Sequence, residues 1–174
     1  MKTADVIIVG SGAAGLFNAL FLPQDYKVIV ITKKTVEESD SFLAQGGISA
    51  LKNPEDYDSY FEDTMKAGHY ENDKGAVEKM IKESPQIIQD LKDFGVRFDL
   101  KDGEIEFTRE GGHSTFRILH HEDLTGKEIT SHLYEEAKKR DNITIMENCM
   151  MIDIIEKDGE CKGIVYKDQD GNFD

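Results

Sequence analysis

The sequence has 174 residues, a length that favours one domain with one sizeable core. With 39% hydrophobic and 32% charged residues, its composition is that of a globular protein. Its formal net charge of −14 repels phosphate backbones and anionic lipid head groups, so nucleic acid and membrane surfaces are not expected partners. Near the N-terminus the longest apolar run is Val6–Val9, too short to span a bilayer, and no basic leader precedes it. We therefore expect a cytoplasmic protein.

The two cysteines, Cys149 and Cys161, carry no sign of a metal site or a redox motif. Neither belongs to a CxxC pair, and no His/Cys cluster has zinc-ligand spacing, so no metal is expected. The pattern indicates two free thiols in a reducing cytoplasm.

The start of the chain predicts a βαβ unit. Residues 5–9 are a β-branched run, as expected of a parallel strand covered on both faces. A glycine-rich turn follows, then a helix over residues 13–22 that Pro23 ends, and a second strand over residues 27–31. A right-handed crossover would place the two strands side by side.

The middle of the chain predicts an irregular segment followed by helices. Residues 33–54 have no clear periodicity, whereas apolar residues recur at helical spacing from Asp56 to Gly95. Within that region Gly68 closes the first helix. Ser84-Pro85 has the form of an N-cap followed by proline at the first helical position, which predicts that a new helix begins there.

The rest of the chain predicts short strands around one more helix. Asp102-Gly103 is a hairpin turn signal, and residues 125–140 have an amphipathic pattern. The predicted strands are residues 96–98, 105–107, 143–146, 150–155 and 163–166. The order of elements favours an α/β fold, with a small β-meander from residue 150 onward.

Gly10-Ser11-Gly12-Ala13-Ala14-Gly15 matches the GxGxxG pattern, and it lies between a predicted strand and a predicted helix. That placement is what a dinucleotide-binding turn requires. The first glycine permits the tight turn, the second lets a pyrophosphate approach the backbone, and the third lets helix and strand pack closely. Free N–H groups at the helix N-terminus would bind the phosphates. We therefore expect a Rossmann-like doubly wound domain.

The second strand lacks the acidic residue that usually holds the ribose in this fold. It ends in Ile31-Thr32-Lys33-Lys34, with no carboxylate until Glu37. This departure counts against a plain NAD-dependent dehydrogenase, but a lysine here is also compatible with the 2′-phosphate of NADP. The turn alone therefore leaves the cofactor open.

The segment after the second strand resembles a known flavin-contacting loop. Ser39-Asp40-Ser41-Phe42-Leu43-Ala44-Gln45-Gly46-Gly47-Ile48 is similar to that loop in the succinate dehydrogenase, fumarate reductase and L-aspartate oxidase flavoprotein family. In this family a Ser/Thr-Lys pair commonly ends the second strand, as Thr32-Lys33 does here. Small residues let backbone amides lie against the isoalloxazine ring. The resemblance implies FAD, with Lys33 and residues 40–47 among its contacts.

A second block of residues resembles the oxidase branch of this family more than its other branches. Phe107-Thr108-Arg109-Glu110-Gly111-Gly112-His113-Ser114 and Arg117-Ile118-Leu119-His120 look like the signature of that branch. The succinate and fumarate enzymes carry an uncharged residue at the position of Glu110. Because aspartate differs from succinate by an amino group, the resemblance implies that Glu110 orients the substrate ammonium. His113, His120 and His121 are given no role in proton transfer.

Asp40 stands where the succinate and fumarate enzymes attach their flavin covalently to histidine. A carboxylate cannot make that bond, so the resemblance implies non-covalent FAD. It also places the Met150-Met151 backbone against the adenosine half of FAD. Residues 1–174 would then be the front part of an FAD-binding domain, inactive without the later catalytic residues.

The implied reaction is oxidation of L-aspartate to iminoaspartate, with flavin N5 accepting the hydride and oxygen or fumarate reoxidising the flavin. The product would feed NAD synthesis through quinolinate synthase. Two alternatives remain open: a fumarate or succinate oxidoreductase, and an FAD-binding module without chemistry of its own.

Overall fold

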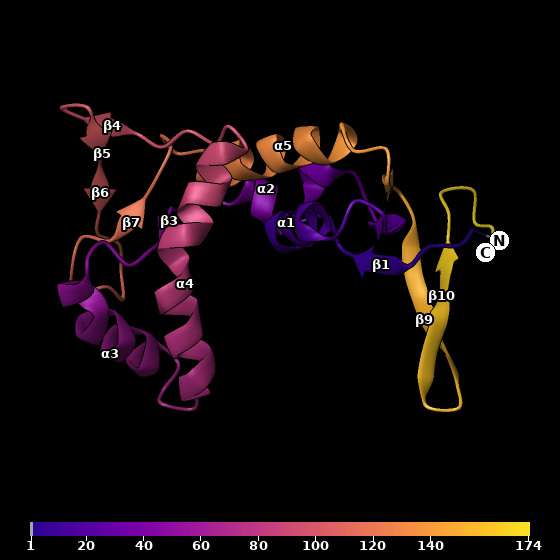
Figure 1. Ribbon diagram of the computed structural model, residues 1–174, viewed down its shortest axis with the longest axis horizontal. Helices are drawn as coiled ribbons and strands as arrows, with labels where there is room; N and C mark the ends of the chain where they lie inside the picture. The colour runs from indigo at the N-terminus through magenta and orange to yellow at the C-terminus, as the bar shows by residue number, and fades with distance from the viewer. Residues whose placement is uncertain (1) are drawn as a thin grey trace. The chain divides into compact units, whose positions relative to one another are not determined.

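The computed structural model describes residues 2–174, which form two compact units. The first unit comprises the chain up to Ala44 together with Ile129–Asp174, and the second comprises Gln45–Glu128. Figure 1 labels the elements. The helices are α1 (Ala13–Phe21), α2 (Asp40–Leu43), α3 (Tyr57–Ala67), α4 (Lys74–Asp93) and α5 (Thr125–Lys138), with short 3-10 turns η1 (Val36–Glu38) and η2 (Pro54–Asp56). The strands are β1 (Val6–Val9), β2 (Val28–Ile31), β3 (Ile48–Ser49), β4 (Leu100–Lys101), β5 (Glu104–Ile105), β6 (Phe107–Thr108), β7 (Ile118–Leu119), β8 (Ile143–Met146), β9 (Met150–Lys157) and β10 (Glu160–Lys167).

A parallel sheet in the order β1-β2-β8 is the centre of the first unit, and it confirms the predicted α/β class. All four residues of β2 are buried, as expected of a central strand. Helix α1 packs against β1 and β2. The expectation that β1 is covered on both faces was wrong. It is the edge strand of the three, and its alternate residues Ile7 and Val9 are 37% and 54% exposed.

Strands β9 and β10 form an antiparallel hairpin that projects from the sheet (Figure 1). Its turn is Asp158-Gly159, and both residues have a positive φ, which the turn requires. The chain then folds back through a bridge between Lys167 and Phe173. Cys149, which is buried just before β9, and the exposed Cys161 are both free thiols, as predicted.

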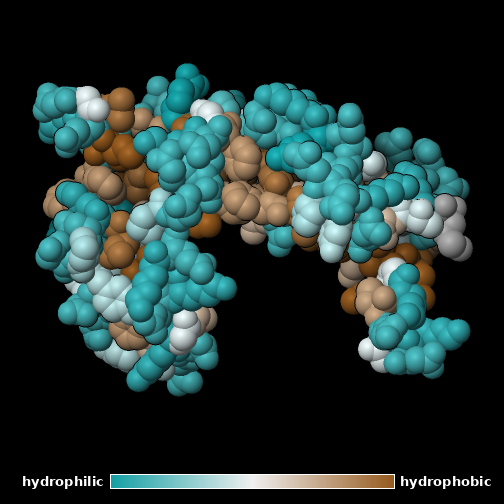
Figure 2. Space-filling model, viewed as in Figure 1, coloured by the Kyte–Doolittle hydropathy of each residue, from teal (hydrophilic) through white to brown (hydrophobic). Residues whose placement is uncertain are grey.

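Helices α3 and α4 form the second unit's main apolar core, where Tyr60, Met65, Val77 and Ile81 are buried. Figure 2 shows the side of α4 that faces the viewer covered by hydrophilic residues, as an amphipathic helix requires.

The prediction that a new helix begins at Ser84-Pro85 was wrong, because α4 continues through Pro85. Proline has no N–H to donate to the carbonyl four residues earlier, that of Ile81. The Ser84 hydroxyl donates to this carbonyl instead, at 2.7 Å, and itself accepts the amide of Leu51 at 2.8 Å.

The small sheets of the second unit confirm one prediction and correct another. Asp102-Gly103 joins β4 to β5 as predicted, with φ values of +55° and +87°. Residues 96–98 do not form the expected strand. The amide of Val96 donates to the Leu91 carbonyl at 3.0 Å and so caps the end of α4, where Gly95 has a positive φ.

The segment expected to be irregular, residues 33–54, contains short ordered elements. Thr35 and Glu38 form a capping box around η1, and the Ser39 hydroxyl accepts the Phe42 amide at the start of α2. Across residues 2–174, no helix has the length and apolar character needed to cross a membrane.

Candidate functional site

The glycine-rich turn has the geometry that a phosphate-binding turn needs. Gly10, at φ +112°, donates its amide to the Ile31 carbonyl at 2.8 Å and thereby ties the turn to β2. A Cβ on Gly15 would lie 2.1 Å from the Gly10 carbonyl oxygen, so only glycine fits there. Gly12 is the N-cap of α1 and leaves the first turn without a side-chain cap or an acidic residue. The start of α1 is therefore open to an anion.

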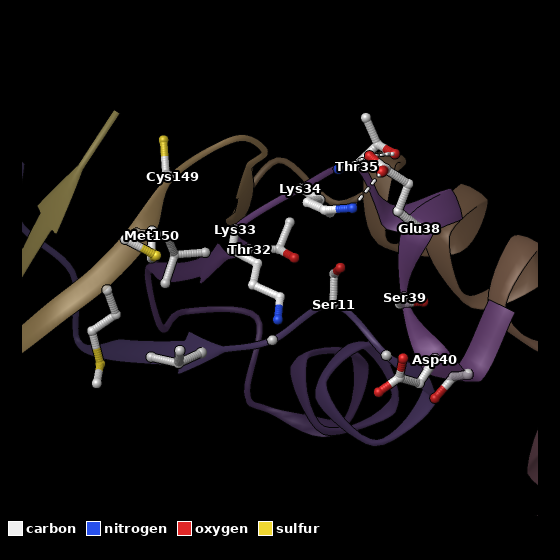
Figure 3. Close-up of a pocket in the computed structure, with 16 residues that line it drawn as sticks. Ser11, Thr32, Lys33, Lys34, Thr35, Glu38, Ser39, Asp40, Cys149 and Met150 are labelled. Carbon is white, nitrogen blue, oxygen red and sulfur yellow. Dashed lines mark hydrogen bonds and ion pairs between the residues drawn. The ribbon is translucent and has the colours of Figure 1, made fainter. Parts of the chain in front are cut away.

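A cavity of about 410 Å³ opens beside this turn, within the first unit (Figure 3). Its walls come from the turn, the end of β2, η1, the start of α2 and the start of β9. Of the predicted site residues, those that line it are Gly10, Ser11, Gly12, Lys33, Asp40, Ser41, Met150 and Met151.

Two features of the cavity indicate a polar ligand. The Ser11 side chain is 1% exposed, and no group within residues 2–174 hydrogen-bonds its hydroxyl. A buried hydroxyl without a partner costs stability, which a ligand that hydrogen-bonds it would restore. Figure 3 shows Lys33 extending from the end of β2 towards the turn that carries Ser11, which brings a cation to the same place.

The remaining predicted contacts do not line this cavity. Ala13, Ala14 and Gly15 lie within α1, where Gly15 packs closely against Gly10. Phe42, Leu43 and Ala44 follow the α2 residues that do line the cavity. Gln45, Gly46 and Gly47 belong to the second unit.

Several lining residues were missed at the sequence level, namely Val9, Ile31, Thr32, Lys34, Thr35, Glu38, Ser39 and Cys149. Glu38 is held by Lys34 at 2.9 Å and by Thr35, and these hydrogen bonds lower its pKa, that from Lys34 most. The signal was present in the sequence, because Thr35-Val36-Glu37-Glu38 has the spacing of a capping box. Glu38 thereby supplies to the cavity the carboxylate that the end of β2 lacks.

In the second unit, Glu110 is hydrogen-bonded to the small-residue loop, here the pair Gly46-Gly47 and its neighbours. Its Oε1 accepts the Gly47 amide at 3.0 Å, and a Cβ on Gly46 would lie 3.3 Å from its Oε2. Glu110 also begins a tight turn, in which the His113 amide donates to the Glu110 carbonyl at 3.3 Å and Gly112 has φ +85°. The carboxylate is exposed, so Oε2 is accessible to a ligand.

Among residues 2–174, Arg117 has the largest fully buried side chain. Two carboxylates neutralise it: Asp56 accepts from Nε at 2.9 Å and from Nη2 at 2.8 Å, and Asp63 accepts from Nη1 at 2.6 Å. The guanidinium carbon also lies 4.8 Å from the centre of the Tyr60 ring. The arginine stands in the signature block, but no local pattern indicated that it would be buried.

Hydrogen bonds lower the pKa of both carboxylates by more than burial raises it. Burial alone would raise the pKa of Asp56, but hydrogen bonds from Arg117, Thr115 and Ser59 outweigh it and lower the pKa to about 2. At Asp63, burial likewise acts to raise the pKa, and hydrogen bonds from Ser114 and Arg117 lower it. Both groups are therefore ionised at neutral pH.

His120 and His121 lie on either side of another carboxylate, Asp99, with N–O distances of 3.1 and 3.4 Å. Glu128 lies 3.8 Å from the second ring nitrogen of His121. Within residues 2–174 no group of three such side chains has the geometry to hold a metal ion.

The parallel sheet, the glycine turn and the adjoining cavity together define a dinucleotide-binding domain. The chain belongs to the FAD binding domain family, whose pattern it matches over residues 5–173. FAD is accordingly its cofactor.

Comparison of the sequence with curated relatives gives a more specific similarity. The chain is 43% identical to an L-aspartate oxidase of Clostridium perfringens over 95% of its length, and 46% identical to one of Clostridium acetobutylicum over 91%. It spans 38% and 37% of those proteins. A structure of E. coli quinol fumarate reductase superposes with a TM-score of 0.88 at 26% identity, covering 94% of this chain and 29% of that one.

Proposed function

We propose that the cavity beside the glycine turn holds the dinucleotide part of FAD. Three observations support this assignment: the Ser11 hydroxyl without a partner, the uncapped start of α1, and the Lys33 cation. Gly12 has no side chain to crowd this wall of the cavity, where a Cβ would lie 2.8 Å from the Ser41 hydroxyl. In this proposal Met150 and Met151 lie against the adenosine half, and residues 40–47 contact the flavin.

FAD is bound without a covalent link in this proposal, because Asp40 stands where related enzymes carry the linking histidine. Residues 1–174 all belong to the FAD-binding domain, which accords with a family match over residues 5–173. The proposed compartment is the cytoplasm, and the proposed partner is quinolinate synthase, which would consume the product.

The proposed reaction is the oxidation of L-aspartate to iminoaspartate. Bound FAD supplies a hydride acceptor. The chain's own contribution is to hold the substrate in a fixed orientation, and Glu110 does so by pairing with the substrate ammonium.

The observation that carries this proposal is the fixed position of the Glu110 carboxylate. The Gly47 amide binds Oε1 at 3.0 Å, so the group is held against the small-residue loop and is not a free surface side chain. Its second oxygen is available to a cation. Relatives at 43% and 46% identity that are named L-aspartate oxidase support the same substrate.

A fumarate or succinate oxidoreductase is the second candidate, and the likeness to quinol fumarate reductase favours it. Its substrates carry no ammonium, so the second oxygen of Glu110 would have no cation to bind. A module that binds FAD without chemistry is the third candidate, and it would bind FAD yet turn over neither substrate.

The test is Glu110→Gln in the full-length protein, with aspartate oxidation and fumarate reduction measured side by side. A charge-assisted hydrogen bond is worth about 1.5–3 kcal/mol, so aspartate turnover should fall roughly ten- to a hundredfold. Fumarate reduction should change much less, because fumarate has no amino group.

Glu104→Gln, an exposed carboxylate in β5, is the matched control and should leave both activities unchanged. Equal loss of both activities in Glu110→Gln would show that Glu110 stabilises the loop and does not recognise the substrate amino group.

A further inference from the structure

We propose that His113 is a second substrate-binding residue, and that the turn from Glu110 to His113 recognises both charged groups of an α-amino acid. Glu110 would bind the ammonium, and the His113 Nε2–H would donate to a carboxylate. The inference rests on the proposed function, because it takes the substrate to be an amino dicarboxylate.

The tautomer of His113 follows from its contact with Arg117. Nη1 of Arg117 lies 3.1 Å from Nδ1 of His113, and a guanidinium nitrogen can only donate. Nδ1 must therefore accept, which places the ring proton on Nε2. The other Nη1 hydrogen goes to Asp63 at 2.6 Å, so the arginine cannot turn away without losing an ion pair.

The turn is fixed at both of its ends. At the first end, Glu110 is bonded to Gly47. At the second end, Asp63 accepts both the amide of Ser114, at 2.7 Å, and its hydroxyl, at 2.8 Å. The His113 ring also lies against Tyr60, with ring centres 6.2 Å apart. Two recognition groups three residues apart are thus held by independent anchors, which is the preorganisation that selective binding needs.

The surroundings of His113 suit a donor to an anion. The residue lines a cavity of about 250 Å³ with Gly111, Gly112 and Ser49, and no group within residues 2–174 accepts a hydrogen bond from its Nε2. Asp63 also lines this cavity, but Arg117 neutralises its carboxylate. The role proposed for His113 is to donate a hydrogen bond, and no proton transfer is assigned to it.

The proposal is tested by titrating succinate, a dicarboxylate without an amino group, against the flavin spectrum of the full-length holoenzyme. His113→Phe keeps the ring but removes the donor, so the Kd for succinate should rise roughly tenfold or more. His113→Gln retains an acceptor for Arg117 and an N–H donor, and its Kd should stay within about threefold of the unaltered protein.

A ¹⁵N spectrum of the histidine rings should show His113 as the Nε2–H tautomer, and succinate should shift the Nε2 resonance, which a purely structural role would not produce. An Nδ1–H tautomer, or an unchanged succinate Kd in His113→Phe, would overturn the proposal. The results distinguish failure of this proposal for His113 from failure of the proposed function. Glu110→Gln should weaken binding of aspartate alone, whereas His113→Phe should weaken binding of aspartate and succinate alike.

Discussion

Replacing Asp56 by asparagine should cost the protein about 3 kcal/mol of stability, because it leaves a buried cation with half of its charge compensation. The Arg117 side chain is 0% exposed and that of Asp56 8%, so water cannot take the place of the lost carboxylate. Removing one partner of a buried pair costs about 3–5 kcal/mol. Asp63 remains 2.6 Å from Nη1, which places the expected cost at the lower end of that range.

The lowered pKa of Asp56 arises from the same hydrogen bonds and predicts how this stabilisation depends on pH. Its fall from 3.8 to about 2 corresponds to about 2 kcal/mol in favour of the folded state. A lowered folded-state pKa stabilises the protein only when the carboxyl is ionised. This contribution is therefore fully present above about pH 4 and is lost as the pH falls towards 2.

The assay is urea unfolding followed by far-UV circular dichroism at pH 7 and at pH 3. Asp56→Asn should lower the unfolding free energy at pH 7 and reduce its loss on acidification. Glu78→Gln is the matched control, since Glu78 pairs with Lys82 on the surface of α4 and should contribute at most about 0.5 kcal/mol. A cost below 1 kcal/mol for Asp56→Asn would refute the argument that this cluster depends on charge compensation.

Two predictions concern the cofactor. Gly12→Val should raise the Kd for FAD roughly tenfold or more, measured by flavin fluorescence quenching, because its side chain would meet Ser41 and enter the cavity. Gly75→Ala, in the first turn of α4, is the control, and equal affinity for FAD in both variants would show that the turn is only structural. Acid precipitation of the holoprotein should release FAD intact into the supernatant, because Asp40 cannot link to it, and flavin retained in the pellet would contradict this.

Local sequence patterns were sufficient wherever an element depends on its own residues. The β-branched run of β2, the GxGxxG turn and the hairpin at Asp102-Gly103 were all predicted where the structure has them. Each depends on a backbone conformation or a periodicity encoded within about ten residues. The capping box at Thr35 was equally local and could have been predicted in the same way.

Tertiary contacts decided what local patterns could not. Helix α4 passes through Pro85 because the Ser84 hydroxyl takes over the Ile81 carbonyl and is itself held by Leu51, 33 residues away in the sequence. Arg117 is buried because Asp56 and Asp63, more than 50 residues earlier, neutralise it and in turn fix the tautomer of His113. Burial of a charge depends on which distant groups surround it, and that is a property of the fold and not of any one segment.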